Sequence, residues 1–143
     1  MAAGVLSRLL EESGRTGAFK VDSAAISDIH VGVPADPMAV EAASSRGYDI
    51  RAIRVRKVEP PDFGAMAVFA MDTVVLASLR NMAPRGLADR PQLLARHSPL
   101  GLDNIVDPYG GHPGEYQAAL SLIEASCKGL LPALLSRDEG SSS

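Results

Sequence analysis

The chain has 143 residues, 46% of them hydrophobic, and a formal net charge of −3 at pH 7. That length builds one domain around one hydrophobic core, and the negative charge gives no support for binding nucleic acid or an anionic membrane. No uninterrupted apolar run reaches the roughly 18 residues that span a bilayer. The single cysteine excludes an internal disulfide, and these features together predict a cytoplasmic protein.

The first part of the chain predicts two helices and one short strand. Residues 1–12 place their leucines and Val5 on one face, as an amphipathic helix does, and Gly14 ends that helix. Phe19–Val21 is a short strand run. Asp36-Pro37 marks the start of a second helix, a capping carboxylate followed by proline in the first turn. The basic segment 51–57 is predicted to be a solvated connection.

The second part predicts two more strands and two more helices. Residues 65–71 read as a strand buried on both faces, Asp72 caps a helix, and residues 92–95 are a weak last strand. A long helix follows, whose buried face is predicted from spacings of three and four residues: Tyr116, Leu120, Ile123, Cys127, Leu130 and Leu134. Pro132 is expected to bend or end this helix, and residues 136–143 to form a disordered polar tail.

Strands that alternate with helices predict an α/β fold with a mostly parallel sheet and helices on both faces. Ligands bind beyond the carboxyl ends of the strands in such sheets. Those ends carry Asp22-Ser23, Asp72 and the approach to Asp107. One polar rim is therefore predicted there.

The loop 105–111 concentrates unusual chemistry. Pro108 keeps Asp107 out of the helical region, so this carboxylate is presented on extended chain, and an aromatic ring and two glycines follow it. One interpretation is a positioned general acid with Tyr109 forming one wall of a pocket. The other is an ordinary Asp-Pro turn that only starts a loop.

Several other chemistries have no support in the sequence. It contains no dinucleotide fingerprint, no Walker loop and no Gly-x-Ser-x-Gly turn. Its three histidines lack ligand spacing, so neither a metal nor another cofactor is expected. Cys127 falls on the buried face of the last helix, where a structural role is expected rather than a nucleophilic one.

Several short strings nevertheless match a known family in order and spacing. They are Val21-Asp22-Ser23-Ala24, Ser27-Asp28, Val31-Gly32, Asp36-Pro37, Arg56-Lys57-Val58, Asp62-Phe63, Ala70-Met71-Asp72, Asp107-Pro108-Tyr109 and Cys127-Lys128-Gly129. Together they resemble the low-molecular-weight protein tyrosine phosphatases. The resemblance covers residues 1 to about 135, which we take as the domain.

The resemblance implies a flavodoxin-like fold that hydrolyses phosphotyrosine or small aryl phosphates through a cysteinyl-phosphate intermediate. Asp107 matches the family's general acid, and Tyr109, Ile29 and His30 match positions that line the substrate. The family's nucleophile and phosphate-binding arginine form a Cys-x5-Arg loop after the first, central strand. The phosphate is held there by backbone N–H groups at a helix N-terminus and by the bidentate arginine.

The chain departs from this pattern at its front end. Met1 aligns just after the phosphate loop, so the first strand and the loop are missing from the chain, and a truncated, inactive phosphatase is expected. Cys127 cannot supply a second Cys-x5-Arg motif. The residue six positions after it, where the motif needs an arginine, is Ala133. The chain departs from the family in smaller ways at three further places. An aromatic residue is usual at Ile29, a second tyrosine is frequent at Gly110, and a polar pair is usual at Val74-Val75. We expect the missing segment in frame upstream of Met1; the alternative is a non-catalytic binding module on the same scaffold.

Overall fold

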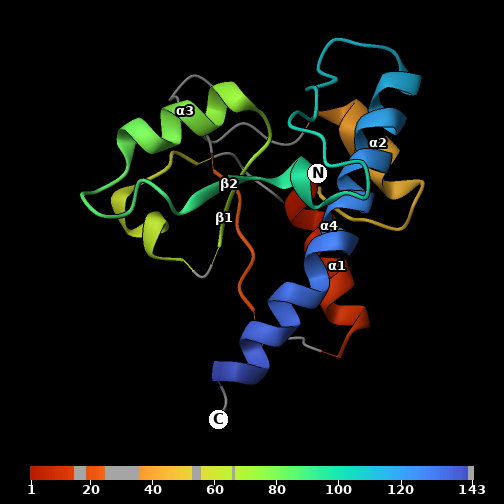
Figure 1. Cartoon of the computed structure of the whole chain (residues 1–143). Coiled ribbons are helices and arrows are strands. Elements are labelled where there is room, and N and C mark those ends of the chain that lie inside the picture. Colours follow the sequence, from red (N-terminus) through yellow and green to blue (C-terminus); the bar gives the residue numbers. More distant parts are fainter. Residues whose placement is uncertain (15–18, 25–35, 53–55, 66, 142–143) are drawn as a thin grey trace.

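The computed structural model describes residues 1–14, 19–24, 36–52, 56–65 and 67–141, the last five by their backbone only. These described residues form four α-helices, two short 3-10 helices and two β-strands (Figure 1). Helix α1 spans Ala2–Glu12 and α2 spans Pro37–Ser44. Both predicted helices in the first part of the chain are thus confirmed.

The caps of the helices follow the predicted chemistry. Asp36 accepts a hydrogen bond from the Met38 N–H at 3.2 Å, with proline as the next residue. Asp72 accepts one from the Val75 N–H at 2.7 Å at the start of α3, which spans Thr73–Met82. Each carboxylate satisfies a backbone donor that the helix leaves without a partner.

The described sheet has two parallel strands, β1 at Val68–Ala70 and β2 at Pro91–Leu93, with Phe69 opposite Gln92. Helices cover both of its faces. Successive β1 side chains face opposite ways, so Ala70 packs in a cluster with Leu76 of α3, while Phe69 packs against the cluster that α1 and α4 share. A parallel sheet between layers of helices agrees with the predicted α/β class.

Two predicted strand segments take other conformations. Residues 19–24 are not assigned to any strand, and residues 94–95 belong to a 3-10 helix, η2, at Leu94–His97. The other 3-10 helix, η1, is Pro60–Gly64, where the sequence predicts no strand. The prediction for 94–95 is wrong because the chain turns directly after Leu93. The strand predicted at Phe19–Val21 finds no ladder partner in the described sheet, and backbone donors and acceptors pair into a strand only across such a ladder.

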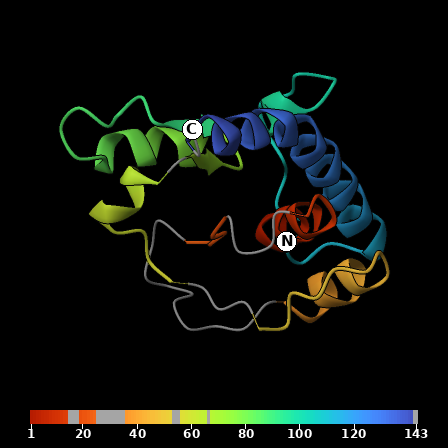
Figure 2. The same ribbon diagram turned by 90° about the horizontal axis from the view of Figure 1, so that it is seen from below.

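Helix α4, Pro113–Ser141, is the central element of the larger core. All six side chains predicted for its buried face are buried. It runs beside α1 and curves across the molecule (Figures 1 and 2). At Gly129 its backbone lies against η2 so closely that a Cβ atom there would be 1.8 Å from the His97 carbonyl oxygen. Glycine is therefore required for this helix to pack on η2.

The C-terminal part of α4 continues past Pro132. Of the two outcomes expected there, a bend or an end of the helix, the end does not occur, because Leu130 and Leu134 are both buried and hold the chain in place on either side of the one lost hydrogen bond. The backbone is helical to Ser141, and the disorder expected for residues 136–143 stays a prediction. The domain boundary at residue 135 stays a prediction.

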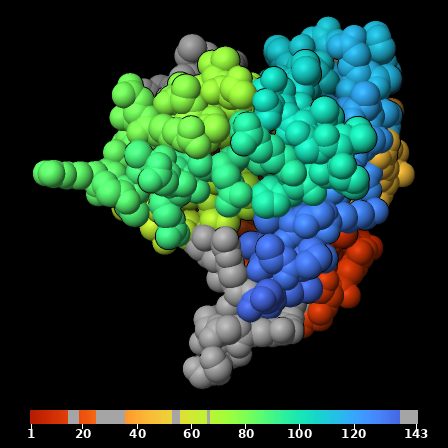
Figure 3. Space-filling view, viewed as in Figure 1, coloured from red at the N-terminus to blue at the C-terminus, as the bar shows by residue number. Residues whose placement is uncertain are grey.

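By length and composition α4 is the one described helix that could cross a membrane. The sequence prediction counted only uninterrupted apolar runs and did not find it. Its apolar stripe packs on α1, α2 and η2, as in the core helix of a globular domain. The face drawn in Figure 3 is made mainly by α3, by the segment between β2 and α4, and by α4 itself.

Replacing Asp72 with alanine is expected to lower the free energy of unfolding by about 1 kcal/mol, because the Val75 N–H loses its capping acceptor. Urea unfolding followed by circular dichroism measures the change as a lower midpoint at constant slope. Asp89→Ala, at an exposed loop position, is the control and should stay within about 0.5 kcal/mol of the parent. Equal effects of both substitutions would contradict the cap.

Candidate active site

The segment before Asp107 is fixed to the carboxyl end of β1 and to the start of α3. The Ile105 N–H donates to the Met71 carbonyl at 2.8 Å. The Thr73 N–H donates to the Asn104 side-chain oxygen at 2.9 Å. These two bonds bring the Asp107 loop to the end of a parallel strand, where the sequence predicts a polar rim.

The Asp107 loop itself is a tight turn. The Tyr109 N–H donates to the Asp107 carboxylate at 3.0 Å, and the Gly111 N–H donates to the Pro108 carbonyl at 2.8 Å. Gly110 at the corner has φ +80°, a conformation that side chains with a Cβ atom rarely adopt. The segment thus forms an Asp-Pro turn, and the general-acid role of its carboxylate stays a prediction. The carboxylate on this turn is exposed, so the turn presents it to solvent.

The N-terminus of α1 packs in the same core as the segment that leads to Asp107, because Met1 and Ala2 lie against the cluster that contains Ile105. Burial lowers the pKa of the Met1 amino group, while the Cys127 thiol and the Asp107 carboxylate act in the opposite direction. No side chain caps this end of α1. A helix N-terminus with uncapped N–H groups is suited to bind an anion, so this end of α1 suits a phosphate group.

Cys127 is buried in the core, as predicted, with 1% of its surface exposed. Burial raises the pKa of this thiol to about 12. A nucleophilic cysteine needs the opposite, an accessible thiolate at neutral pH. The geometry therefore gives Cys127 a packing role.

The residues predicted to line the substrate are only partly placed. Tyr109, two residues after Asp107, is 76% exposed and lines neither of the two cavities beside α1, so its substrate-lining role stays a prediction. Ile29 and His30 lie outside the described residues. In the described part of the chain, no group of three histidine, cysteine or acidic side chains could hold a metal ion.

Sequence reasoning missed the role of Arg56. The basic segment 51–57 was predicted to be solvated, yet Arg56 binds both oxygens of Asp62 at 2.9 Å and Asp22 at 3.0 Å. The Arg56 bond to Asp62 holds the pKa of that carboxyl below its usual value. The contact ties segment 19–24 to η1. Asp22 and Asp62 stood in the matching strings, but no spacing rule pairs residues this far apart.

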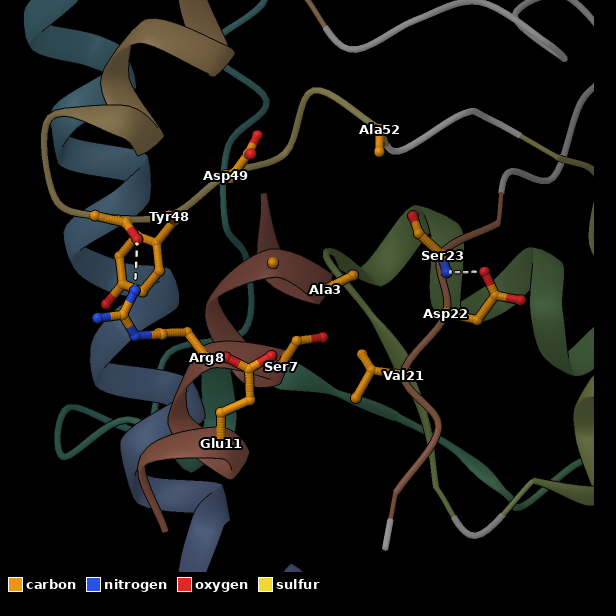
Figure 4. A pocket seen from close by; sticks show the side chains of 12 residues that line it. Ala3, Ser7, Arg8, Glu11, Val21, Asp22, Ser23, Tyr48, Asp49 and Ala52 are labelled. Atoms are coloured by element: carbon orange, nitrogen blue, oxygen red, sulfur yellow. Dashed lines mark hydrogen bonds between the residues drawn. The ribbon is translucent and has the colours of Figure 1, made fainter. Parts of the chain in front are cut away.

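Two cavities flank helix α1 along most of its length. The polar pocket, about 480 Å³, is lined from α1 by Ser7, Arg8 and Glu11, and by Asp22 and Asp49 from other segments. Figure 4 shows the Arg8 side chain turned toward the Tyr48 segment, where it donates to the Gly47 carbonyl at 3.0 Å. Asp107 and Tyr109 do not line this pocket.

The second cavity, which we name the apolar slot, has a volume of about 490 Å³. Most of its lining is apolar, with a charged part at Lys20, Asp22, Arg56 and Asp62. The apolar lining includes Leu6 and Leu10 of α1, Phe19 and Val21, Val68 and Phe69 of β1, Val75 and Leu79 of α3, Leu94 of η2, and Cys127 and Leu134 of α4. The extended segment 19–24 and strand β1 thus both border the slot, and in the described sheet β1 pairs only with β2.

Comparison with known proteins agrees with this arrangement. A model of the low molecular weight phosphotyrosine protein phosphatase family matches residues 1–140. The low molecular weight protein-tyrosine-phosphatase of Streptomyces coelicolor is 30% identical over 98% of this chain and 88% of that protein. A Bacillus subtilis relative described in the same words is 28% identical over 94% of this chain and 86% of its own.

Solved structures show the same likeness. A protein tyrosine phosphatase from Entamoeba histolytica superposes with a TM-score of 0.87 at 25% identity, over 94% of this chain and 88% of that one. The Bacillus subtilis protein's crystal structure superposes with a TM-score of 0.84 at 27% identity, over 95% and 86%. The family model spans nearly every residue, and sequence relatives and structural neighbours agree with it. The chain belongs to the low molecular weight phosphotyrosine protein phosphatase family.

Proposed function

We propose that this chain serves the hydrolysis of phosphotyrosine or small aryl phosphate monoesters in the cytoplasm, with Asp107 as the general acid. The observation that carries the proposal is the exposed Asp107 carboxylate on a loop whose Ile105 packs in the same core as Met1 and Ala2, at the uncapped N-terminus of α1. In the proposed complex the phosphate binds at that helix end and its ester oxygen is turned toward the carboxyl group. Tyr109 forms one wall for the aryl ring. The family resemblance adds Ile29 and His30 as further residues that line the substrate.

Two proton transfers would involve Asp107. As the phosphorus–oxygen bond breaks, the carboxylic acid gives its proton to the leaving phenol oxygen. The resulting carboxylate then takes a proton from the water that attacks the cysteinyl phosphate, and phosphate and free thiolate are released. General acid–base catalysis of this kind contributes about 10²–10⁴-fold.

The nucleophile for these steps is absent from the printed residues. They contain no Cys-x5-Arg, and the only thiol is the buried Cys127, whose pKa is raised to about 12. We therefore propose that residues 1–143 by themselves do not turn over aryl phosphates. Turnover would need a segment that brings a thiolate and a bidentate arginine to the N-terminus of α1.

The apolar slot supports a place for one further strand. Its lining includes the extended residues 19–24, which have no ladder partner in the described sheet, and residues of β1, which pairs there with β2 alone. A parallel strand between them would satisfy backbone donors and acceptors on both sides and fill the slot with apolar side chains. It would run toward the N-terminus of α1, where the loop is needed. We propose that this strand completes a flavodoxin-like sheet.

A non-catalytic binding module is the second candidate. It is favoured by the absence of an accessible thiol from the printed sequence, while the helix N-terminus suited to an anion is present. The two candidates differ in how residues 1–143 unfold, because a stand-alone module must close around the slot and unfold cooperatively.

Purified residues 1–143 are expected to hydrolyse p-nitrophenyl phosphate no faster than buffer, because an acid without a nucleophile has no phosphoenzyme to form. The measurement is release of p-nitrophenol at several pH values between 5 and 8. Asp107→Asn tests any residual rate, with Asp89→Asn as a control at an exposed position away from the loop. Activity that is lost in Asp107→Asn and kept in Asp89→Asn would contradict the proposed inactivity.

A further inference from the structure

A buried tyrosine hydroxyl joins the helix after the Asp107 loop to the helix capped by Asp36. Tyr116 lies in the first turn of α4, its side chain is 2% exposed, and its hydroxyl donates to the Asp36 carboxylate, 80 residues away in the chain. The other oxygen of the same carboxylate caps α2 through the Met38 N–H. The start of α4 is therefore tied to the start of α2, which lies beside it (Figure 1).

Tyr116 follows the Asp107 loop almost directly. The turn closes at Gly111, whose N–H donates to the Pro108 carbonyl at 2.8 Å, and the Glu115 N–H donates to the His112 carbonyl at 3.0 Å at the start of α4. The bond to Asp36, burial and the charges of Asp36 and Asp107 raise the pKa of Tyr116, while the Gly110 backbone N–H acts to lower it. The bond to Asp36 thus holds the first turn of α4, into which the loop leads. On the other side of Asp107, the bond from Ile105 to Met71 fixes the loop to β1.

We propose that Tyr116 is a positioning residue for Asp107: its hydroxyl, held by Asp36, anchors the far side of the turn that presents the general acid. A phenylalanine would fill the same buried space, so packing alone does not need the hydroxyl. What the hydroxyl adds is a charge-assisted hydrogen bond that fixes the turn between β1 and α2. The inference rests on the proposed function, because the placement of Asp107 matters only if it transfers a proton.

The test is backbone hydrogen exchange in Tyr116→Phe, measured by NMR on the full chain. Two amides report on the turn: Tyr109, whose N–H binds the Asp107 carboxylate, and Gly111, whose N–H binds the Pro108 carbonyl. Both should exchange about two- to tenfold faster, the range that one hydrogen bond of about 0.5–1.5 kcal/mol gives. Hydrogen exchange does not depend on catalysis. The exchange rates therefore test the positioning role even if the protein proves not to hydrolyse aryl phosphates.

Tyr48→Phe is the matched control. Tyr48 is also buried and donates to a carboxylate on α4, Glu124, at 2.8 Å, but Glu124 lies two helical turns beyond Tyr116. Loss of the Tyr48 hydroxyl should leave the exchange rates of the Tyr109 and Gly111 amides unchanged. Unchanged exchange in Tyr116→Phe, or equal acceleration in both variants, would overturn the proposal.

Asp36→Ser provides a second route should Tyr116→Phe not fold. Serine is as good an N-cap as aspartate, so α2 keeps its cap, but the shorter side chain does not reach the Tyr116 hydroxyl. The variant should accelerate exchange at the Tyr109 and Gly111 amides as Tyr116→Phe does. Exchange equal to that of the parent chain would overturn the positioning role.

Discussion

Replacing Leu120 with alanine is expected to lower the free energy of unfolding by about 2–5 kcal/mol. Leu120 is fully buried in the N-terminal third of α4, in the cluster where α1, α2 and η2 meet. The substitution loses the transfer free energy of its methyl groups and leaves a cavity that rigid neighbours fill only in part. Against a total of about 5–15 kcal/mol, such a loss populates the unfolded state at 37 °C.

Leu100→Ala is the control for this prediction. The chemical change is identical, but Leu100 is 77% exposed in the segment after η2, so its loss should cost less than about 0.5 kcal/mol. Urea unfolding of the two variants and the parent measures the difference. Similar midpoints for Leu120→Ala and Leu100→Ala would mean that α4 does not pack as the structure shows.

The elements that sequence reasoning predicted well depend on local chemistry. The buried face of α4 follows from residues three and four apart, and Asp36 and Asp72 cap helices whose first turns directly follow them. The Asp107 turn could likewise be predicted, because proline, glycine and an aspartate side chain that binds a nearby backbone N–H favour a turn within a few residues. Each of these signals lies within a single element.

The predictions that failed depend on partners elsewhere in the chain. Phe19–Val21 has the composition of a strand, but a strand forms only when a neighbouring edge pairs with it. Of the bend or end expected at Pro132, only the end is wrong, because buried leucines on either side outweigh the local preference against a helix. The Tyr116–Asp36 bond joins residues 80 apart, so no periodicity indicates it.

Filling the apolar slot is expected to stabilise the protein. A chain in which an apolar strand and a Cys-x5-Arg loop precede Met1 is expected to unfold at a higher temperature, and more sharply, than residues 1–143. Each apolar side chain that enters the slot contributes up to about 1.5–3 kcal/mol, and the strand pairs with the open edge of β1. Residues 1–143 alone should bind a hydrophobic dye and unfold over a broad range, because Leu6, Val68 and Phe69 line the unfilled slot.

The design needs two comparisons, both followed by calorimetry and by p-nitrophenyl phosphate turnover. In the first, the added strand carries serines in place of its apolar residues, and stabilisation should disappear while the loop sequence is kept. In the second, Asp107→Asn in the extended chain should lower turnover by about 10²–10⁴-fold, the contribution of a general acid. A sharp transition for residues 1–143 that the added segment leaves unchanged would show that the remaining elements already close around the slot, and the binding-module interpretation would then replace the phosphatase one.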